Sequence, residues 1–337
     1  MNQDPRLQQL QQWLQQSLGL TDFNLTVASA DASFRRYFRV SSAQQTRIAM
    51  DAPPDKENCE PFVHVAQLIE SCGVQSPHIF EVSRELGFML LSDLGSTSYL
   101  SKLDNNSADH LYHDAINSLI KMQPLCTATA TQGLPLYDEK LLQFEMSLCR
   151  DWYFDKHLQI KLTNNQLEVL QATFNLLTQN ALQQPQVFVH RDYHSRNLMI
   201  TESNNPGVID FQDAVVGAIS YDLVSLLKDC YIAWPRPKVE QLVHYFLQQS
   251  PPLAGTSFEQ FIRWFDLMGA QRHIKVLGIF ARLNHRDGKP GYLNDIPRVL
   301  AYVFDVCERY TELHGLRDLL HSLNLKPDLA TLELIQT

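Results

Sequence analysis

The chain has 337 residues, of which 45% are apolar and 19% charged, with a formal net charge of −9. This acidic balance argues against broad nucleic-acid binding, which needs a basic surface. No stretch approaches the ~20 apolar residues of a membrane span and the N-terminus lacks the apolar run of a signal peptide, so we expect a globular, cytoplasmic protein with no membrane partner.

The first 95 residues have the pattern of a small sheet with a leading helix. Residues 5–18 place their apolar side chains on one side of an amphipathic helix. Between residues 24 and 94, short apolar or alternating runs are separated by turn residues, which is typical of strands. One helix, at about 57–71, interrupts them. We therefore predict an antiparallel N-terminal lobe with a leading helix over residues 1–95.

From about residue 107 the pattern becomes helical. Helical periodicity fills 107–123, 138–158, 163–183 and much of the chain after 221, with a long helix from 257 to about 285. The connector at 90–95 separates this part from the strand-rich one. The sequence thus predicts an α+β fold of two lobes, the second over 96–337, with a cleft between them, where binding sites are favoured.

The most informative segment is 190–197, His-Arg-Asp-Tyr-His-Ser-Arg-Asn, with Asp210 thirteen residues further on. Phosphoryl transfer from ATP needs a base for the acceptor hydroxyl and Mg²⁺ for the phosphates, and Mg²⁺ prefers oxygen ligands. Asp192 suits the base. Asn197 and Asp210 suit the metal ligands, because a hairpin turning at 204–207 would return Asp210 beside Asn197. Singly these residues are ordinary loop residues, but together they match the kinase template.

The same segments resemble a known superfamily. After Asp210 comes Phe-Gln-Asp, where protein kinases have Phe-Gly, and Tyr221-Asp222-Leu223 opens a helix, in which we interpret Asp222 as an N-cap or a buried structural acceptor. Over nearly its whole length the chain resembles the aminoglycoside phosphotransferase and choline kinase relatives of protein kinases, which implies a two-lobed protein-kinase-like fold.

A closer resemblance rests on three longer stretches, at 29–39, 50–58 and 272–292. They are similar to the bacterial N-acetylmuramate/N-acetylglucosamine anomeric kinases of cell-wall recycling. This resemblance implies an amino-sugar substrate, phosphorylation of its anomeric hydroxyl and α-1-phosphate products. It implies no protein partner.

Two parts of the protein-kinase nucleotide site are missing. Protein kinases use a Gly-rich loop and a third-strand lysine, whereas here Ser33 and Phe34 stand in the first turn and Met50 takes the place of the lysine. We favour Arg36, on the neighbouring strand, as the substitute cation, although a solvated charge is equally compatible with the pattern. The adenine would lie against the connector, where we expect contacts from Leu91, Ser92 and Leu94.

On the substrate side, the long helix carries Lys275, Arg282 and Arg286 within about 40° of one another at 100° per residue. This basic stripe is either a solvated helix face or a site for an anion, such as the lactyl carboxylate of N-acetylmuramate. Further candidates for contacts with the sugar are His194, Arg196 and Asp213.

Two other functions stay open at this point. Aminoglycosides and choline are cations, so their kinases need clustered carboxylates or an aromatic cage. The basic residues of the C-terminal segment disfavour them. A pseudokinase, which binds nucleotide without transferring phosphate, is favoured only by the missing lysine and disfavoured by the intact Asp192, Asn197 and Asp210.

Overall fold

The computed structural model describes residues 4–30, 34–43, 45–126 and 133–337. The chain divides into two compact units. The first comprises Met1–Ser98 and Leu198–Asp213, and the second comprises Tyr99–Asn197 and Ala214–Thr337. Among the described helices, none has the length and apolarity that crossing a membrane requires.

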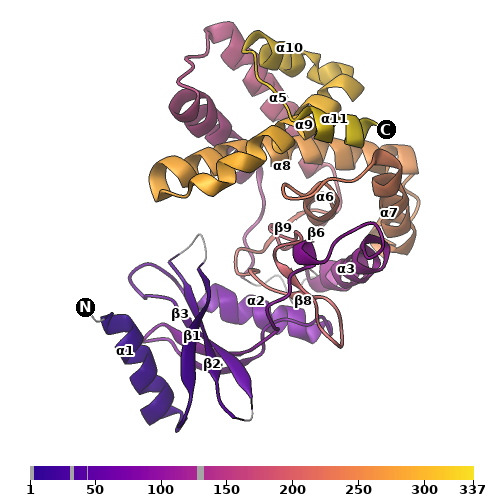
Figure 1. Ribbon diagram of the computed structural model, residues 1–337. Helices are drawn as coiled ribbons and strands as arrows, with labels where there is room; N and C mark the ends of the chain where they lie inside the picture. The colour runs from indigo at the N-terminus through magenta and orange to yellow at the C-terminus, as the bar shows by residue number, and fades with distance from the viewer. Residues whose placement is uncertain (1–3, 31–33, 44, 127–132) are drawn as a thin grey trace. The chain divides into compact units, whose positions relative to one another are not determined.

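The first unit contains a five-stranded antiparallel sheet in the order β1-β2-β3-β5-β4 (Figure 1). Its strands are β1 (Asn24–Ala30), β2 (Arg36–Ser41), β3 (Thr46–Asp51), β4 (Ile79–Ser83) and β5 (Phe88–Ser92). The same unit holds a short hairpin of β7 (Leu198–Met199) and β8 (Gly207–Val208). That hairpin is the one predicted between Asn197 and Asp210.

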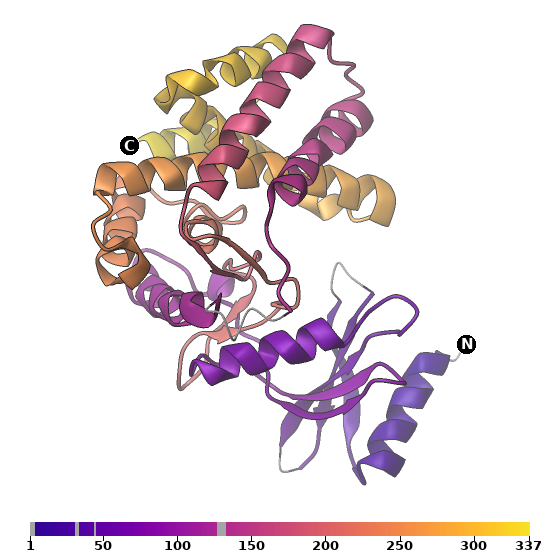
Figure 2. The ribbon, with the colours of Figure 1, turned by 180° about the vertical axis from the view of Figure 1, so that it is seen from behind.

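Two helices cover the sheet, α1 (Pro5–Gln12) and α2 (Glu60–Ser71), on opposite faces (Figures 1 and 2). The first continues as a single π-helical turn, η1 (Trp13–Ser17). The predicted amphipathic helix is confirmed, because its buried Leu10, Trp13 and Leu14 pack on Phe38 and Phe88 of the sheet. Alternation along β2 and β5 turns those aromatic side chains to the face that α1 covers.

The second unit is mostly helical, which confirms the predicted α+β class. Its α-helices are α3 (Ala108–Met122), α4 (Glu139–Leu148), α5 (Asn164–Leu182), α6 (Tyr221–Leu227), α7 (Arg236–Gln249), α8 (Phe258–Asp287), α9 (Ile296–Arg309), α10 (His314–Ser322) and α11 (Leu329–Gln336). The π-helix η4 (Cys149–His157) extends α4, and the 3₁₀ turns are η2 (Tyr99–Ser101), η3 (Gln123–Cys126), η5 (Pro251–Leu253), η6 (Pro290–Asp295) and η7 (Thr311–Leu313). A two-stranded ladder pairs β6 (Gln186–Val189) with β9 (Val215–Ala218).

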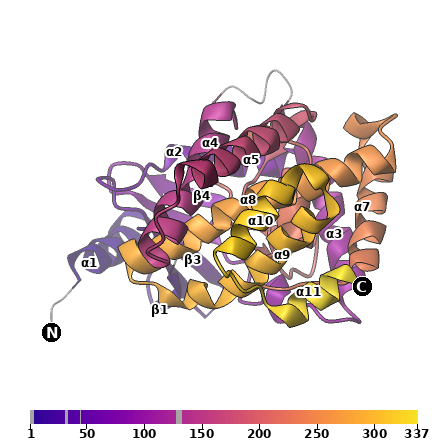
Figure 3. The same ribbon diagram turned by 90° about the horizontal axis from the view of Figure 1, so that it is seen from above.

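The long helix α8 is the centre of this unit. It runs beside α5 and α9 (Figure 3), and α4, η4 and α6 also pack on it. Gly278 permits one of these contacts, because a Cβ there would lie 2.3 Å from the backbone carbon of Leu148. The helix ends at Gly288, whose φ of 65° suits a glycine cap. Lys275 of α8 and Arg191 of the loop that follows β6 both pair with Glu145 of α4, so α8 is connected to that loop through Glu145.

Candidate functional site

The segment 190–197 is a loop held by a buried carboxylate. Asp222, in the first turn of α6, accepts hydrogen bonds from the backbone nitrogens of His190 at 2.6 Å and Arg191 at 3.0 Å. The expected role of Asp222 as a structural acceptor is therefore confirmed. Burial raises the pKa of Asp222 to about 7, although the two N–H groups act in the opposite direction.

A second buried carboxylate, which the sequence analysis missed, holds the far end of the loop. Asp229 Oδ2 accepts from the backbone nitrogen of Ser195 at 2.9 Å and from its hydroxyl at 2.5 Å. The Asn197 side-chain nitrogen donates to the carbonyl of Asp192 at 3.0 Å. Together with Asp222, these bonds tie the loop at both ends through its backbone and the side chains of Ser195 and Asn197, without using the carboxylate of Asp192.

The Asp192 carboxylate is half-buried in a positively charged setting. Burial by itself would raise the pKa of Asp192, but the charges of Lys275, Arg191 and Arg272 outweigh it and hold that pKa below its usual range. Asp192 is therefore ionised at neutral pH. An ionised carboxylate can align an acceptor hydroxyl and take its proton.

The positive charge next to Asp192 comes from a buried group that we call the Glu145 cluster. It comprises Tyr137, Glu145, Arg191, Tyr221 and Lys275. The Lys275 nitrogen lies 3.0 Å from a Glu145 oxygen and donates to the Tyr221 hydroxyl at 3.0 Å. Arg191 pairs with the same Glu145 oxygen, and Tyr137 donates to the other. Two cations face one carboxylate, so the cluster carries a net positive charge that stabilises ionised Asp192.

Replacing Lys275 should therefore change the pH dependence of the reaction. Because a depressed pKa keeps Asp192 ionised, activity is lost only as pH falls through that pKa. In Lys275→Met the pKa of Asp192 rises, and the acid limb of the kcat/KM profile should move to higher pH. Lys161→Met, which removes an exposed lysine paired with Asp155, serves as the control and should leave the limb in place. An unmoved acid limb in Lys275→Met would contradict this account.

In the first unit, Asp210 follows β8 in an uncommon backbone conformation. Its φ is 63°, and that of Arg191 in the second unit is 76°. Positive φ is rare for residues other than glycine and is concentrated at functional sites. The side-chain nitrogen of Gln212 donates to Asp210 at 2.8 Å and reaches exposed Asp213 at 3.4 Å. This bond orients the Asp210 carboxylate.

Three arginines in or just before β2 each have a carboxylate partner. Arg36 pairs with Asp4 and with buried Asp51, and Arg39 pairs with Asp93 at 2.6 Å. Arg35 pairs with Glu57 at 2.8 Å. Burial would lower the pKa of Arg35, but the fields of Tyr37, Glu57, Asp213 and Asp210 raise it above its usual value. Of the three, Arg35 is the one whose surroundings include Asp210.

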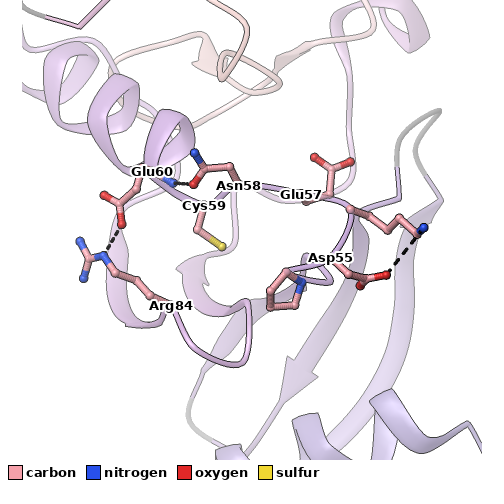
Figure 4. Close-up of a pocket in the computed structure, with 8 residues that line it drawn as sticks. Asp55, Glu57, Asn58, Cys59, Glu60 and Arg84 are labelled. Atoms are coloured by element: carbon pink, nitrogen blue, oxygen red, sulfur yellow. Dashed lines mark hydrogen bonds and ion pairs between the residues drawn. The ribbon is translucent and has the colours of Figure 1, made fainter.

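A polar pocket of about 460 Å³ lies in the same unit, between the residues that precede α2 and Arg84 (Figure 4). Four of its charged groups are paired with one another, because Lys56 lies 3.7 Å from Asp55 and Arg84 pairs with Glu60. We assign it no ligand. Its relevance to the site is that the same loop presents Glu57 to Arg35.

The remaining nucleotide-side candidates belong to the first unit. Ser33 lies outside the described residues, and the neighbouring Phe34 has an exposed side chain. Leu91 is buried in β5, opposite Ile48. Ser92 ends that strand with its hydroxyl accepting from the His78 backbone at 2.9 Å, and Leu94 follows half-buried. Their contacts with a nucleotide stay a prediction.

The substrate-side candidates of the second unit differ in their surroundings. Arg196 is exposed and lies 3.5 Å above the centre of the Tyr231 ring, and the His194 ring meets Tyr231 edge-on. Burial lowers the pKa of His194, so its ring is neutral at pH 7. Lys275 belongs to the Glu145 cluster. The other two, Arg282 and Arg286, lie nearer the end of α8, where Arg286 pairs with Asp287 at 2.7 Å.

This loop, its buried supports and the helical unit around it match a known family. The family model described as "Phosphotransferase enzyme family" matches residues 24–258. The chain belongs to this phosphotransferase family. The match includes segment 190–197 and Asp210, whereas Lys275, Arg282 and Arg286 lie beyond its end at residue 258.

Relatives of this phosphotransferase extend over nearly its entire length. An N-acetylmuramate/N-acetylglucosamine kinase of Pseudomonas aeruginosa is 45% identical, covering 96% of this chain and 98% of the relative. A kinase of the same name from Neisseria meningitidis is 43% identical, covering 93% and 95%. The resemblance drawn from the three long stretches is thus confirmed.

Solved structures of low sequence identity share the fold. A wild-type aminoglycoside 2'-phosphotransferase-IIIa in complex with GDP superimposes with a TM-score of 0.64 at 15% identity, over 88% of this chain and 99% of that one. A choline kinase from Streptococcus pneumoniae gives 0.62 at 13% identity, over 88% and 98%. These likenesses confirm the protein-kinase-like fold expected of the phosphotransferase.

Proposed function

We propose that the protein is an ATP- and Mg²⁺-dependent kinase that phosphorylates the anomeric hydroxyl of N-acetylmuramate and N-acetylglucosamine. The α-1-phosphate products would serve cell-wall recycling. The single observation that carries the proposal is the ionised Asp192 on a loop clamped by Asp222 and Asp229, in a chain 43–45% identical to kinases of that name.

In this proposal Asp192 receives the proton of the anomeric hydroxyl as the hydroxyl oxygen attacks the γ-phosphorus. The bond from the γ-phosphorus to the β–γ bridging oxygen breaks, and ADP leaves with its electron pair. The clamped loop supplies orientation, because it fixes the carboxylate without using its oxygens for support. Oriented acceptors account for much of the catalysis in phosphoryl transfer. The positive Glu145 cluster keeps Asp192 ionised until the proton arrives.

Asn197 and Asp210 suit Mg²⁺ as ligands by their chemistry. Both offer hard oxygen donors, and Mg²⁺ is usually held by one or two carboxylates together with substrate phosphates and water. The Asn197 amide nitrogen donates to the Asp192 carbonyl, so the amide oxygen would be the end that binds the metal. When bound, Mg²⁺ would neutralise charge on the ATP phosphates.

Arg35 is our candidate to replace the missing third-strand lysine in binding the ATP phosphates. In protein kinases that lysine pairs with a glutamate of the helix after the third strand and with the phosphates. Arg35 pairs with Glu57, just before α2, and is influenced by Asp210. Arg36, which the sequence favoured, is held between Asp4 and Asp51. Its role in nucleotide binding stays a prediction, but the contacts favour Arg35.

Replacing Arg35, Arg36 and Arg39 one at a time by Met tests which of them, if any, replaces the missing lysine. Arg35→Met should raise the MgATP dissociation constant or lower turnover by roughly tenfold to hundredfold, the range of one charge-assisted hydrogen bond. MgATP affinity and steady-state turnover are the measurements. A loss confined to Arg36→Met would restore the sequence-based assignment, and changes within about twofold in all three would show that β2 supplies no substitute.

The function itself is tested with a panel of acceptors. N-acetylmuramate, N-acetylglucosamine, aminoglycosides and choline are each incubated with MgATP, and phosphorus NMR locates the new phosphate. We expect a phosphate on the anomeric oxygen of both amino sugars. Phosphorylation of choline or an aminoglycoside alone would favour the other kinase class, and nucleotide binding without any transfer would favour a pseudokinase.

A further inference from the structure

Two of the three basic side chains on one face of α8 already have a carboxylate. Lys275 is buried in the Glu145 cluster, with its nitrogen 3.0 Å from a Glu145 oxygen. Arg286, in the last turn, contacts both oxygens of Asp287, at 2.7 and 2.9 Å. Both side chains therefore already have a carboxylate partner within the protein.

Arg282 differs from both. Among the residues that the structure describes, it forms no hydrogen bond and no ion pair, and its Nε is buried without an acceptor. Burial lowers the pKa of Arg282, and Arg286 lowers it further, while Asp287 and Glu145 act weakly in the opposite direction. A buried donor without a partner is costly and uncommon in folded proteins. The half-buried guanidinium is thus suited to receive an anion.

We propose that Arg282 binds the carboxylate of N-acetylmuramate and is the residue through which the enzyme distinguishes its two sugars. The proposal rests on the proposed function. The two sugars that name the relatives differ in one group, because N-acetylmuramate bears a lactyl ether, with its carboxylate, where N-acetylglucosamine has a hydroxyl. A guanidinium offers a planar pair of N–H donors that matches a carboxylate.

The position of Arg282 on α8 fits this role. It follows Lys275 by about two helical turns, so the two share a face and lie roughly 10 Å apart along the axis. Lys275 acts electrostatically on Asp192, and Glu145 is a neighbour of both cations. A sugar with its anomeric hydroxyl at Asp192 would extend along α8 toward Arg282. All of these residues belong to the second unit.

The half-buried position of Arg282 also explains how the site can bind the neutral sugar, N-acetylglucosamine. With N-acetylglucosamine bound, the outward N–H groups of Arg282 remain in contact with water, so only the buried Nε lacks an acceptor. Arg196, another arginine for which the described residues provide no ion pair, is exposed, belongs to segment 190–197 and stacks on Tyr231. There it would act on the reacting end, which both sugars share, and not on the group in which they differ.

The test compares the two sugars in one variant. We expect Arg282→Met to lower kcat/KM for N-acetylmuramate by roughly tenfold to hundredfold. For N-acetylglucosamine it should stay within about twofold, because no carboxylate contact is lost. The matched control is Arg263→Met on the same helix, a partly exposed arginine paired with Glu312, for which both sugars should keep their wild-type values. Because both sugars are measured in one preparation, the ratio is independent of the fraction folded.

The outcomes distinguish failure of the proposed role of Arg282 from failure of the proposed kinase function. Suppose that the wild type phosphorylates both sugars, and that Arg282→Met lowers kcat/KM for both sugars equally or for neither. Arg282 then does not recognise the carboxylate, whereas the proposed function still holds. If the wild type phosphorylates only the neutral sugar, the inference is likewise overturned. If it phosphorylates neither sugar, the proposed function fails and the role of Arg282 fails with it.

Discussion

Asp192→Asn should lower kcat by roughly 10²–10⁴-fold, the usual range for loss of a general base. The amide cannot take the proton of the hydroxyl. The loop should keep its shape, because Asp222 and Asp229 hold it through its backbone and through Ser195. MgATP affinity should therefore stay close to wild type. Single-turnover rates and nucleotide binding, measured on the same preparation, check both halves of this expectation.

The control for this variant is Asp151→Asn, which changes an exposed aspartate paired with Arg150. It should leave kcat within about twofold, as surface charges contribute little. If Asp192→Asn kept a tenth or more of the wild-type rate in an assay limited by chemistry, another group would be the base. A parallel loss of MgATP affinity would instead indicate that Asp192 serves the nucleotide or the metal.

Asp210→Ala should abolish turnover and weaken the binding of MgATP. The lost contact is one between a carboxylate and a hard cation. The φ of 63° at Asp210 adds a second effect, because alanine tolerates this conformation poorly. Asp210→Asn is the better-matched variant, since asparagine accepts positive φ and keeps one oxygen.

Nucleotide affinity measured with and without Mg²⁺ separates the loss of the metal contact from an effect on the backbone at residue 210. For Asp210→Asn we expect the gain in affinity that Mg²⁺ gives the wild type to shrink, while binding of nucleotide in the presence of a chelator stays unchanged. Wild-type affinity in saturating Mg²⁺ would exclude Asp210 as a metal ligand. A loss of equal size with and without Mg²⁺ would place Asp210 in a structural role instead.

The sequence by itself determined the features that depend on short-range spacing. Alternation of apolar residues predicted the strands of the small sheet, and helical periodicity predicted α1 and α8. The segment 190–197 and Asp210 were found because a kinase needs their side chains at fixed intervals and a hairpin links them. Arg191 and Asp210 also share a positive φ, which no pattern in the sequence predicted.

Only the tertiary structure decided which charges are paired. Glu145, Asp229 and Glu57 lie far along the chain from the residues they hold, so no local period connects Lys275 with Glu145 or Ser195 with Asp229. In the sequence, Lys275, Arg282 and Arg286 of α8 could not be told apart as paired or unpaired, because helical spacing gives the direction of a side chain and not its partner. Packing of α4 and η4 against α8 gave Lys275 a carboxylate partner in Glu145, whereas no described carboxylate pairs with Arg282.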